Sequence, residues 1–264
     1  HTVIKLLAPH LHSLNFRDAY KPSICTGAFV LDQKTGKVLK VFSAETILAT
    51  GGVGQLYLYT TNCQYARGDG LAFASELGAK LTNLEYIQFH PTTLFSPKAE
   101  RFLITEAMRG EGGILKNQEG ERFMERYHQN LELAPRDVVA RAIHKELMRT
   151  NTDFVYLDIS FKNPQWIRER FPQVFERCQN VGIDITREPI PVVPAAHYSC
   201  GGVRVDLEGR TNVNRLWAVG EVSCTGIHGA NRLASTSLLE CLLWGYSCAK
   251  AVSRNLQREK HYDY

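Results

Sequence analysis

Four short polar clusters carry the side chains that could do chemistry. Each contains histidine, arginine, glutamate or threonine, beside proline in the first cluster and beside glycine in the other three. They are QFHPT at 88–92, TEAMRGEGG at 105–113, HYSCGG at 197–202 and GEVSCTGIHGANR at 220–232. Core packing gives no reason to place histidine and arginine beside glycine. Because binding residues are often carried on loops that a rigid scaffold positions, we expect these clusters on turns and loops.

Arginines and histidines from these clusters could together bind a small dianion. The planar fork of a guanidinium matches a carboxylate with two hydrogen bonds, and histidine and threonine can supply further donors. Arg136 is a strong candidate, because it follows Pro135 at a predicted helix start, where a cation opposes the helix dipole. Arg232 lies in GANR, which has no amphipathic period, and His197 lies outside any predicted regular element. The hypothesis requires these side chains to converge in the folded chain.

Simpler interpretations exist for some of these residues. His90 precedes Pro91 and could cap a turn. Arg109 and Glu111 could form a surface ion pair, which would contribute less than ~1 kcal/mol to stability. Taken singly, neither pattern requires a binding site.

Two groups of predicted elements position the clusters. The first group is a hairpin of 24–31 and 37–42 around the turn 33–36, a short strand at 45–49 that ends in Thr-Gly-Gly, and a helix at 71–77 opened by Gly-Asp-Gly. The second group begins with a helix at Pro135, which has an apolar stripe, and a strand at 154–159. A helical stretch at 163–180 follows, which Pro172 should split. A strand at 216–220 and a helix at 235–257 complete the group. The stretch 84–126 is predicted to be irregular, because it is rich in glycine, glutamate, arginine and proline.

The α/β pattern occurs at both ends of the chain, and the polar, glycine-rich part lies between them. This order is what an insertion between two strands of one sheet would produce. We therefore expect two domains, one formed by 1–80 together with 198–264, and an inserted one formed by 81–197. At about 150 residues per domain, 264 residues allow two.

Composition excludes several classes of protein. Apolar residues make up 44% and charged residues 22%, which is globular rather than disordered or coiled-coil. The net charge of +4, from 31 basic and 27 acidic residues, is too weak to favour nucleic-acid binding. No apolar run reaches the ~18 residues that a transmembrane helix needs. Seven cysteines without CxxC spacing indicate reduced thiols, so we expect a cytoplasmic protein.

Several well-known motifs are absent from the sequence. The 264 residues contain no GxGxxG, no GxSxG and no P-loop, and the nine histidines lack HExxH spacing, so no metal site is expected. The first residue is histidine rather than methionine, and we expect the chain to be an internal piece of a longer protein.

Seven motifs in order resemble those of one family, the flavoproteins of succinate dehydrogenase, fumarate reductase and L-aspartate oxidase. They are ATGG, GDG, QFHPT, LITEAMRGEGG, PRD, HYSCGG and GEVSCTGIHGANRLASTSLLE, and they span 49–240. Within the family, the variants LAPRD, PAAHY and GEVS favour the L-aspartate oxidase branch.

The resemblance implies a fold class of α/β plus α+β: a partial FAD-binding, Rossmann-like domain interrupted by a capping domain. It implies that a dicarboxylate substrate is bound by His90, Thr105, His197 and Arg232, and that Arg136 is the general acid/base. The residues implied to contact FAD are Asp69, Glu221, Ser237 and Leu238, with His10 and Leu11 as further candidates.

The implied reaction is flavin-dependent oxidation of L-aspartate to iminoaspartate, with oxygen or fumarate as electron acceptor. In the family this is the first step of de novo NAD biosynthesis, and the product goes on to quinolinate synthase. Two alternatives remain open: a flavoprotein subunit of fumarate reductase or succinate dehydrogenase, and a non-catalytic fragment without bound FAD. The family's N-terminal GxGxxG and C-terminal helical region are missing, so we expect this chain alone to carry little FAD.

Overall fold

The chain divides into two compact units in the computed structural model, which describes residues 1–97 and 102–260. Unit 1 consists of His1–Val53, Gln64–Ile87 and Tyr198–Tyr264, and unit 2 consists of Gly54–Cys63 and Gln88–His197. Each unit therefore draws on segments that are far apart in the sequence.

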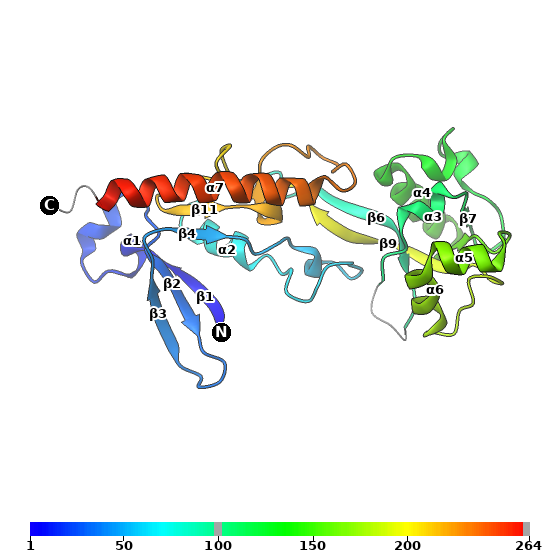
Figure 1. Cartoon of the computed structure of the whole chain (residues 1–264), viewed down its shortest axis with the longest axis horizontal. Helices are drawn as coiled ribbons and strands as arrows, with labels where there is room; N and C mark the ends of the chain where they lie inside the picture. The colour runs from blue at the N-terminus through cyan, green and yellow to red at the C-terminus, as the bar shows by residue number, and fades with distance from the viewer. Residues whose placement is uncertain (98–101, 261–264) are drawn as a thin grey trace. The chain divides into compact units, whose positions relative to one another are not determined.

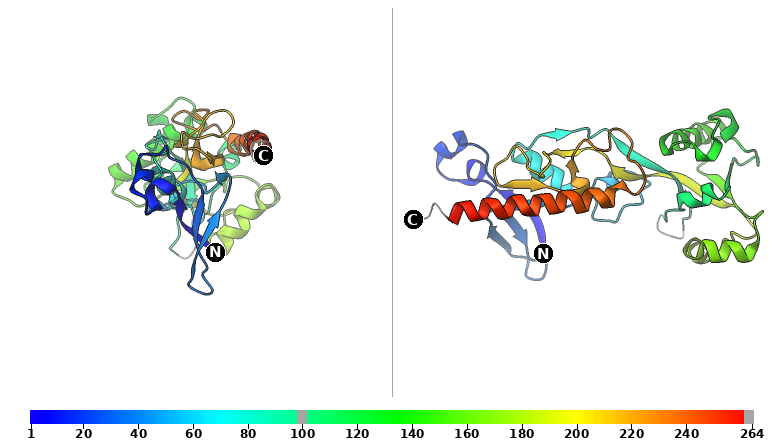
Figure 2. Two further views of the ribbon diagram at one scale, coloured as in Figure 1. Left: turned by 90° about the vertical axis from the view of Figure 1, so that its left-hand side faces the viewer. Right: turned by 45° about the horizontal axis from the view of Figure 1, so that its top comes forward.

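A parallel strand pair covered by a helix on each face forms the centre of unit 1. Strand β4 (Thr46–Leu48) pairs with β11 (Leu216–Ala218), as Figure 1 shows. Leu216 and Ala218 pack with α2 (Asp69–Glu76), whereas Trp217 packs against Cys248 and Ala251 of α7 (Thr236–Lys260). Alternate residues of a strand point to opposite faces, so β11 holds both helices. Figure 2 shows α7 running alongside this pair.

Two further sheets complete unit 1. Strands β1 (Thr2–Leu7), β2 (Gly27–Leu31) and β3 (Val38–Phe42) form an antiparallel sheet, in which β2 and β3 are the predicted hairpin. Strands β5 (Leu81–Thr82), β10 (Gly202–Arg204) and β12 (Ser223–Cys224) form the other sheet. A short helix, α1 (Pro9–His12), follows β1, a strand that the sequence analysis did not predict.

The three glycine-containing motifs of unit 1 meet where the parallel strands end. The Gly68 amide donates to the Gly52 carbonyl at 3.2 Å. A Cβ on Gly52 would lie 2.2 Å from Oε1 of Glu221, and one on Gly70 would lie 2.0 Å from Oγ1 of Thr50. The three motifs are therefore neighbours in the fold, and only glycine permits such close backbone approach.

Unit 2 is built on a four-stranded sheet with short helices around it. The strand order is β6 (Ile87–Leu94), β9 (Ile190–Ser199), β8 (Val155–Asp158) and β7 (Ile114–Lys116). The helices are α3 (Glu106–Gly110), α4 (Arg136–Thr150), α5 (Pro164–Arg170) and α6 (Pro172–Gln179). Pro172 splits the helical stretch as predicted. Strand β8 pairs with β7 and β9, whereas β11 pairs with β4, so the two buried strands predicted at 154–159 and 216–220 belong to different sheets.

The expectation of an irregular stretch at 84–126 is wrong in part. This stretch contains β6, α3 and β7, and the 10-residue strand β9 follows later without having been predicted. Prolines obscured both long strands, because proline is unfavourable inside a sheet. Pro91 is tolerated in β6 because β6 lies at the edge of this sheet.

Within the described ranges 1–97 and 102–260, no helix combines the length and apolar character needed to cross a membrane. In the same ranges, no group of three or more histidine, cysteine or acidic residues could hold a metal ion. The seven cysteines, all of them described, are unpaired.

Candidate functional site

Two histidines from neighbouring strands lie together in unit 2. His90 of β6 and His197 of β9 have ring centroids 5.4 Å apart in an edge-to-face arrangement. His90 is 1% exposed, and its Nδ1 lies 3.3 Å from the amide nitrogen and 3.2 Å from the carbonyl oxygen of Thr92. Its Nε2 is buried without a hydrogen-bond partner in the described part of the chain. A buried ring nitrogen in this state is suited to a bound polar ligand.

The His90 ring is held in its neutral form. Burial lowers its pKa well below the ordinary value, and the charges at His197, Arg136 and Arg109 lower it further. A neutral imidazole has one N–H and one acceptor nitrogen, so at pH 7 His90 can serve a ligand as a hydrogen-bond donor without adding charge.

His197 is oriented by a second contact within unit 2. Its Nδ1 lies 2.7 Å from Oγ1 of Thr61, in the segment Gly54–Cys63. Both histidines therefore lie on strands, and the expectation that they belong to turns or loops is wrong. Strands fix ring positions more tightly than loops, which favours a preformed site.

Arg136 is the first residue of α4, and a carboxylate from another helix anchors it. Its Nη2 and Nε lie 2.6 and 2.9 Å from Oε2 of Glu106, and its Nη1 donates to Oε1 of Gln88 at 3.2 Å. The unfavourable helix-dipole position is thus offset by Glu106, a partner that the sequence analysis missed. The only signal for Glu106 was its place in the cluster TEAMRGEGG, directly after Thr105.

Thr105 and Arg109 flank Glu106 on α3. Thr105 is the N-cap, and its hydroxyl accepts from the Ala107 amide at 3.3 Å. Arg109 is 2% exposed, donates to the Glu132 carbonyl at 2.6 Å and lies 3.5 Å from Oε1 of Glu106. The alternative of a surface pair between Arg109 and Glu111 is therefore wrong, because Arg109 is buried.

These contacts give the unit 2 cluster a cationic character. Burial lowers the pKa of Arg109; Glu106 counteracts the shift, and Arg136 reinforces it. Arg136 and Arg109 share the single carboxylate of Glu106, beside the neutral His90. An anion bound here would relieve the mutual repulsion of the two guanidinium groups.

The predicted residues of unit 1 form a separate cluster around Arg232. Its guanidinium carbon lies 4.5 Å from the ring centroid of Tyr198, and its Nη1 lies 3.4 Å from Oγ of Ser237. Arg232 is 6% exposed. The phenol of Tyr198 donates to Oε2 of Glu240 at 2.8 Å.

The Glu221 side chain, just after β11, contacts the backbone of Ser199 and Gly52. Its Oε1 accepts from the Ser199 amide at 2.9 Å, and the Ser199 hydroxyl accepts from the Val53 amide at 3.1 Å. Burial raises the pKa of Glu221, partly offset by the Ser199 hydrogen bonds and the charge of Arg232. Gly52 is buried directly alongside, where the Glu221 and Ser199 side chains leave no room for a Cβ.

The other residues proposed to contact FAD lie at the starts of helices in unit 1. Asp69 is the first residue of α2 and pairs with Arg67 at 3.0 Å, and Ser237 and Leu238 are in the first turn of α7. Leu238 is 72% exposed. Ser235, just before α7, has a φ of 67°, which is uncommon for a residue other than glycine. His10 and Leu11 lie on α1.

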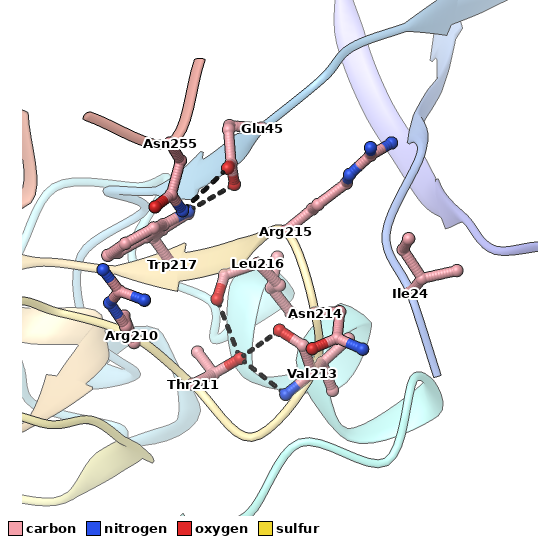
Figure 3. A pocket seen from close by; sticks show the side chains of 10 residues that line it. All are labelled: Ile24, Glu45, Arg210, Thr211, Val213, Asn214, Arg215, Leu216, Trp217 and Asn255. Carbon is pink, nitrogen blue, oxygen red and sulfur yellow. Dashed lines mark hydrogen bonds between the residues drawn. The ribbon is translucent and has the colours of Figure 1, made fainter. Parts of the chain in front are cut away.

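Unit 1 also contains a cavity of about 400 Å³, which is lined by other residues (Figure 3). In its wall, Nε1 of Trp217 donates to Glu45 at 2.6 Å, and Asn255 donates to the same carboxylate at 3.1 Å. None of the residues predicted for substrate or cofactor lines it.

One family model covers the glycine-rich strand ends, the half-buried Glu221 and the starts of α2 and α7. The model of the family described as FAD binding domain matches residues 10–238. The chain belongs to the FAD-binding domain family. The resemblance inferred from the seven motifs is thereby confirmed, and FAD is the family's cofactor.

Members of the FAD-binding domain family and solved structures resemble the chain over most of its length. It is 55% identical over 228 residues to L-aspartate oxidase 1 of Ralstonia nicotianae, covering 86% of this chain and 43% of that protein. It is 53% identical over 232 residues to L-aspartate oxidase of Pseudomonas aeruginosa, covering 88% and 43%. A structure of E. coli quinol fumarate reductase FrdA matches with a TM-score of 0.81 at 35% identity, covering 89% and 43%. The chain thus spans less than half the length of these relatives.

Proposed function

We propose that the protein carrying this chain oxidises L-aspartate to iminoaspartate with FAD as cofactor and oxygen or fumarate as electron acceptor. The observation that carries the proposal is the cluster of the buried, neutral His90 with the cationic Arg109 and Arg136, within a chain more than half identical to proteins named L-aspartate oxidase. The reaction would open de novo NAD biosynthesis in the cytoplasm. Its product would pass to quinolinate synthase.

The proposed domain roles follow the division into two units. Residues 1–80 and 198–264 would form the FAD-binding domain, and 81–197 would form the capping domain that contributes to the substrate site. The compactness of the two units supports this proposal, with the segment Gly54–Cys63 grouped with unit 2.

The residues of unit 1 fit FAD in chemistry. Gly51, where a Cβ would meet nothing within 4 Å, leaves the backbone open at the end of the parallel strands, the usual ligand-binding edge of such sheets. Asp69 and Ser237, at the first turns of α2 and α7, would provide polar contacts, and Leu238 would provide an apolar contact. FAD, when bound, supplies the acceptor for the hydride that leaves the substrate carbon.

The chain's own residues would bind and orient the substrate. Arg232 offers a planar fork for one carboxylate, and His90, His197 and Thr105 offer further hydrogen bonds. Fixing both carboxylates determines which carbon–hydrogen bond can react. Arg136 would exchange the proton in the reverse-type reaction, fumarate reduction, while Glu106, 2.6 Å away, holds its guanidinium in place.

An assay with two substrates tests this function. In a protein of the relatives' full length that carries this chain, we expect L-aspartate to produce hydrogen peroxide and succinate to leave a redox dye unreduced. The similarity to a quinol fumarate reductase favours one other candidate, the flavoprotein subunit of such a complex. Succinate-dependent dye reduction without aspartate-dependent peroxide would establish that candidate instead.

A flavin spectrum tests how much cofactor the 264-residue chain holds alone. Because its sequence has no GxGxxG turn leading into a helix N-terminus, we expect far less than one FAD per chain after purification. The measurement is visible flavin absorbance relative to protein concentration. One tightly bound FAD per chain would contradict the expectation and would also exclude the alternative of a fragment unable to bind FAD.

A further inference from the structure

A buried hydrogen-bonded cluster lies beside Arg232 in unit 1, and the function proposed above does not use it. Glu240 of α7 is 3% exposed and accepts from the Tyr198 phenol at 2.8 Å and from the Thr225 hydroxyl at 2.7 Å. Its Oε2 also lies 2.7 Å from Nε2 of His228. The cluster joins the end of β9, the segment after β12 and helix α7.

Tyr198 connects this cluster to Arg232. The guanidinium carbon of Arg232 lies 4.5 Å from the ring centroid, and both side chains belong to residues that are 6% exposed. A guanidinium over an aromatic face is attracted by the ring's quadrupole, and the attraction grows when water is excluded. The flat face of the ring also restricts the tilt of the guanidinium plane.

The charges in the cluster keep Tyr198 in place. Burial alone would raise the pKa of Glu240, but hydrogen bonds from His228, Thr225 and Tyr198 hold it below its ordinary value. Burial, together with the Glu240 carboxylate, raises the pKa of Tyr198. The phenol therefore remains a donor and the carboxylate remains ionised, so a charge-assisted hydrogen bond fixes the ring.

We propose that Tyr198, held by Glu240, is a positioning residue that sets the plane of the Arg232 guanidinium for two-pronged binding of a substrate carboxylate. The inference rests on the proposed role of Arg232 as a substrate-binding residue. Two parallel N–H···O bonds require the guanidinium and carboxylate to be nearly coplanar. A tilted guanidinium would keep its charge but lose one of the two bonds.

The test compares substitutions that remove or keep the ring, in a protein of the relatives' full length that carries this chain. We expect Tyr198→Leu to raise KM for L-aspartate about five- to thirtyfold, the range between an exposed and a desolvated cation–π contact. kcat should change by a smaller factor, and the FAD content should stay the same. Tyr198→Phe keeps the aromatic face but loses the hydrogen bond that fixes it, so its KM should lie between those of the parent and of Tyr198→Leu.

Tyr246→Leu is the matched control. Tyr246 lies on α7, is 62% exposed and carries Lys250 at 4.5 Å from its ring centroid, the same distance as in the Arg232 contact. Its substitution should leave KM for L-aspartate unchanged. If Tyr198→Leu does not fold, as judged by melting temperature and bound FAD, Tyr198→Met takes its place.

A double-substitution cycle asks whether Tyr198 acts through Arg232. In an Arg232→Lys background, where no planar fork remains, Tyr198→Leu should raise KM by less than about twofold more. Fully additive effects, an unchanged KM in Tyr198→Leu, or equal damage from Tyr198→Phe and Tyr198→Leu would each overturn the inference. A parent protein without activity on L-aspartate would instead refute the proposed function.

Discussion

Replacing Arg136 by leucine is expected to lower kcat for fumarate reduction by about a hundredfold to ten-thousandfold, the range for loss of a proton-transfer group. The same change should raise KM by a smaller factor, since it also removes a charge-assisted contact worth about 1.5–3 kcal/mol. FAD content should stay the same, because Arg136 belongs to unit 2 and the proposed FAD contacts belong to unit 1. Steady-state kinetics on the full-length protein provide the measurement.

Stability should change little in this variant. Glu106, which loses its partner, is 42% exposed and keeps Arg109 at 3.5 Å, so its charge remains solvated and partly paired. Helix α4 keeps its buried Val139, Ala142 and Ile143.

Arg141→Leu is the control on the same helix. Arg141 is 66% exposed and pairs with Asp137, so the change removes a surface ion pair worth at most ~1 kcal/mol and should leave kcat unaltered. An Arg136→Leu enzyme with near-normal kcat and only a raised KM would reduce Arg136 to a binding residue.

Replacing Glu146 by alanine is expected to destabilise unit 2 by about 3 kcal/mol, because several charge-assisted hydrogen bonds to one buried carboxylate are lost. The Glu146 side chain on α4 is fully buried and accepts from Arg126 and Arg149 at 2.7 Å each and from Asn117 at 3.0 Å. Its removal leaves Arg126 and Arg149, which are 43% and 45% exposed, with the more exposed Glu119 and Glu121 as partners. Hydrogen exchange of the α4 amides at increasing urea concentration measures the loss.

The same carboxylate predicts an acid transition. Burial alone would raise the pKa of Glu146, but hydrogen bonds from Arg149, Asn117 and Arg126 lower it to about 2, against 4.5 ordinarily. A lowered folded-state pKa gives stability that is present above about pH 4.5 and is lost as the pH falls toward 2. The shift corresponds to about 3 kcal/mol, which should be absent from the pH profile of Glu146→Ala.

Glu119→Ala serves as the control for Glu146. Glu119 belongs to the same network, pairing with Arg149 at 3.3 Å, but is 60% exposed. Its loss should lower stability by less than about 1 kcal/mol. Equal destabilisation by the two substitutions would show that burial of Glu146 is not what stabilises α4.

Local signals in the sequence were sufficient for several elements. The hairpin β2–β3, the helices α4 and α7, and the break at Pro172 all follow from periodicity and proline chemistry, which act within a few residues. Strands β6 and β9 were missed for the same reason, because their prolines oppose the local pattern. Their stability comes from pairing with strands distant in sequence, which local propensity does not register.

For the candidate site too, the sequence supplied one part of the information and the tertiary structure supplied the rest. The motifs alone determined the family and named His90, His197, Arg136 and Arg232 as chemically important, since their types and order carry that information. Only the tertiary structure decided which partners hold them. Glu106 compensates Arg136, Glu240 and Tyr198 lie behind Arg232, and burial keeps His90 neutral. Ion pairing, ring stacking and desolvation depend on distances between segments far apart in the chain, and these distances exist only after folding.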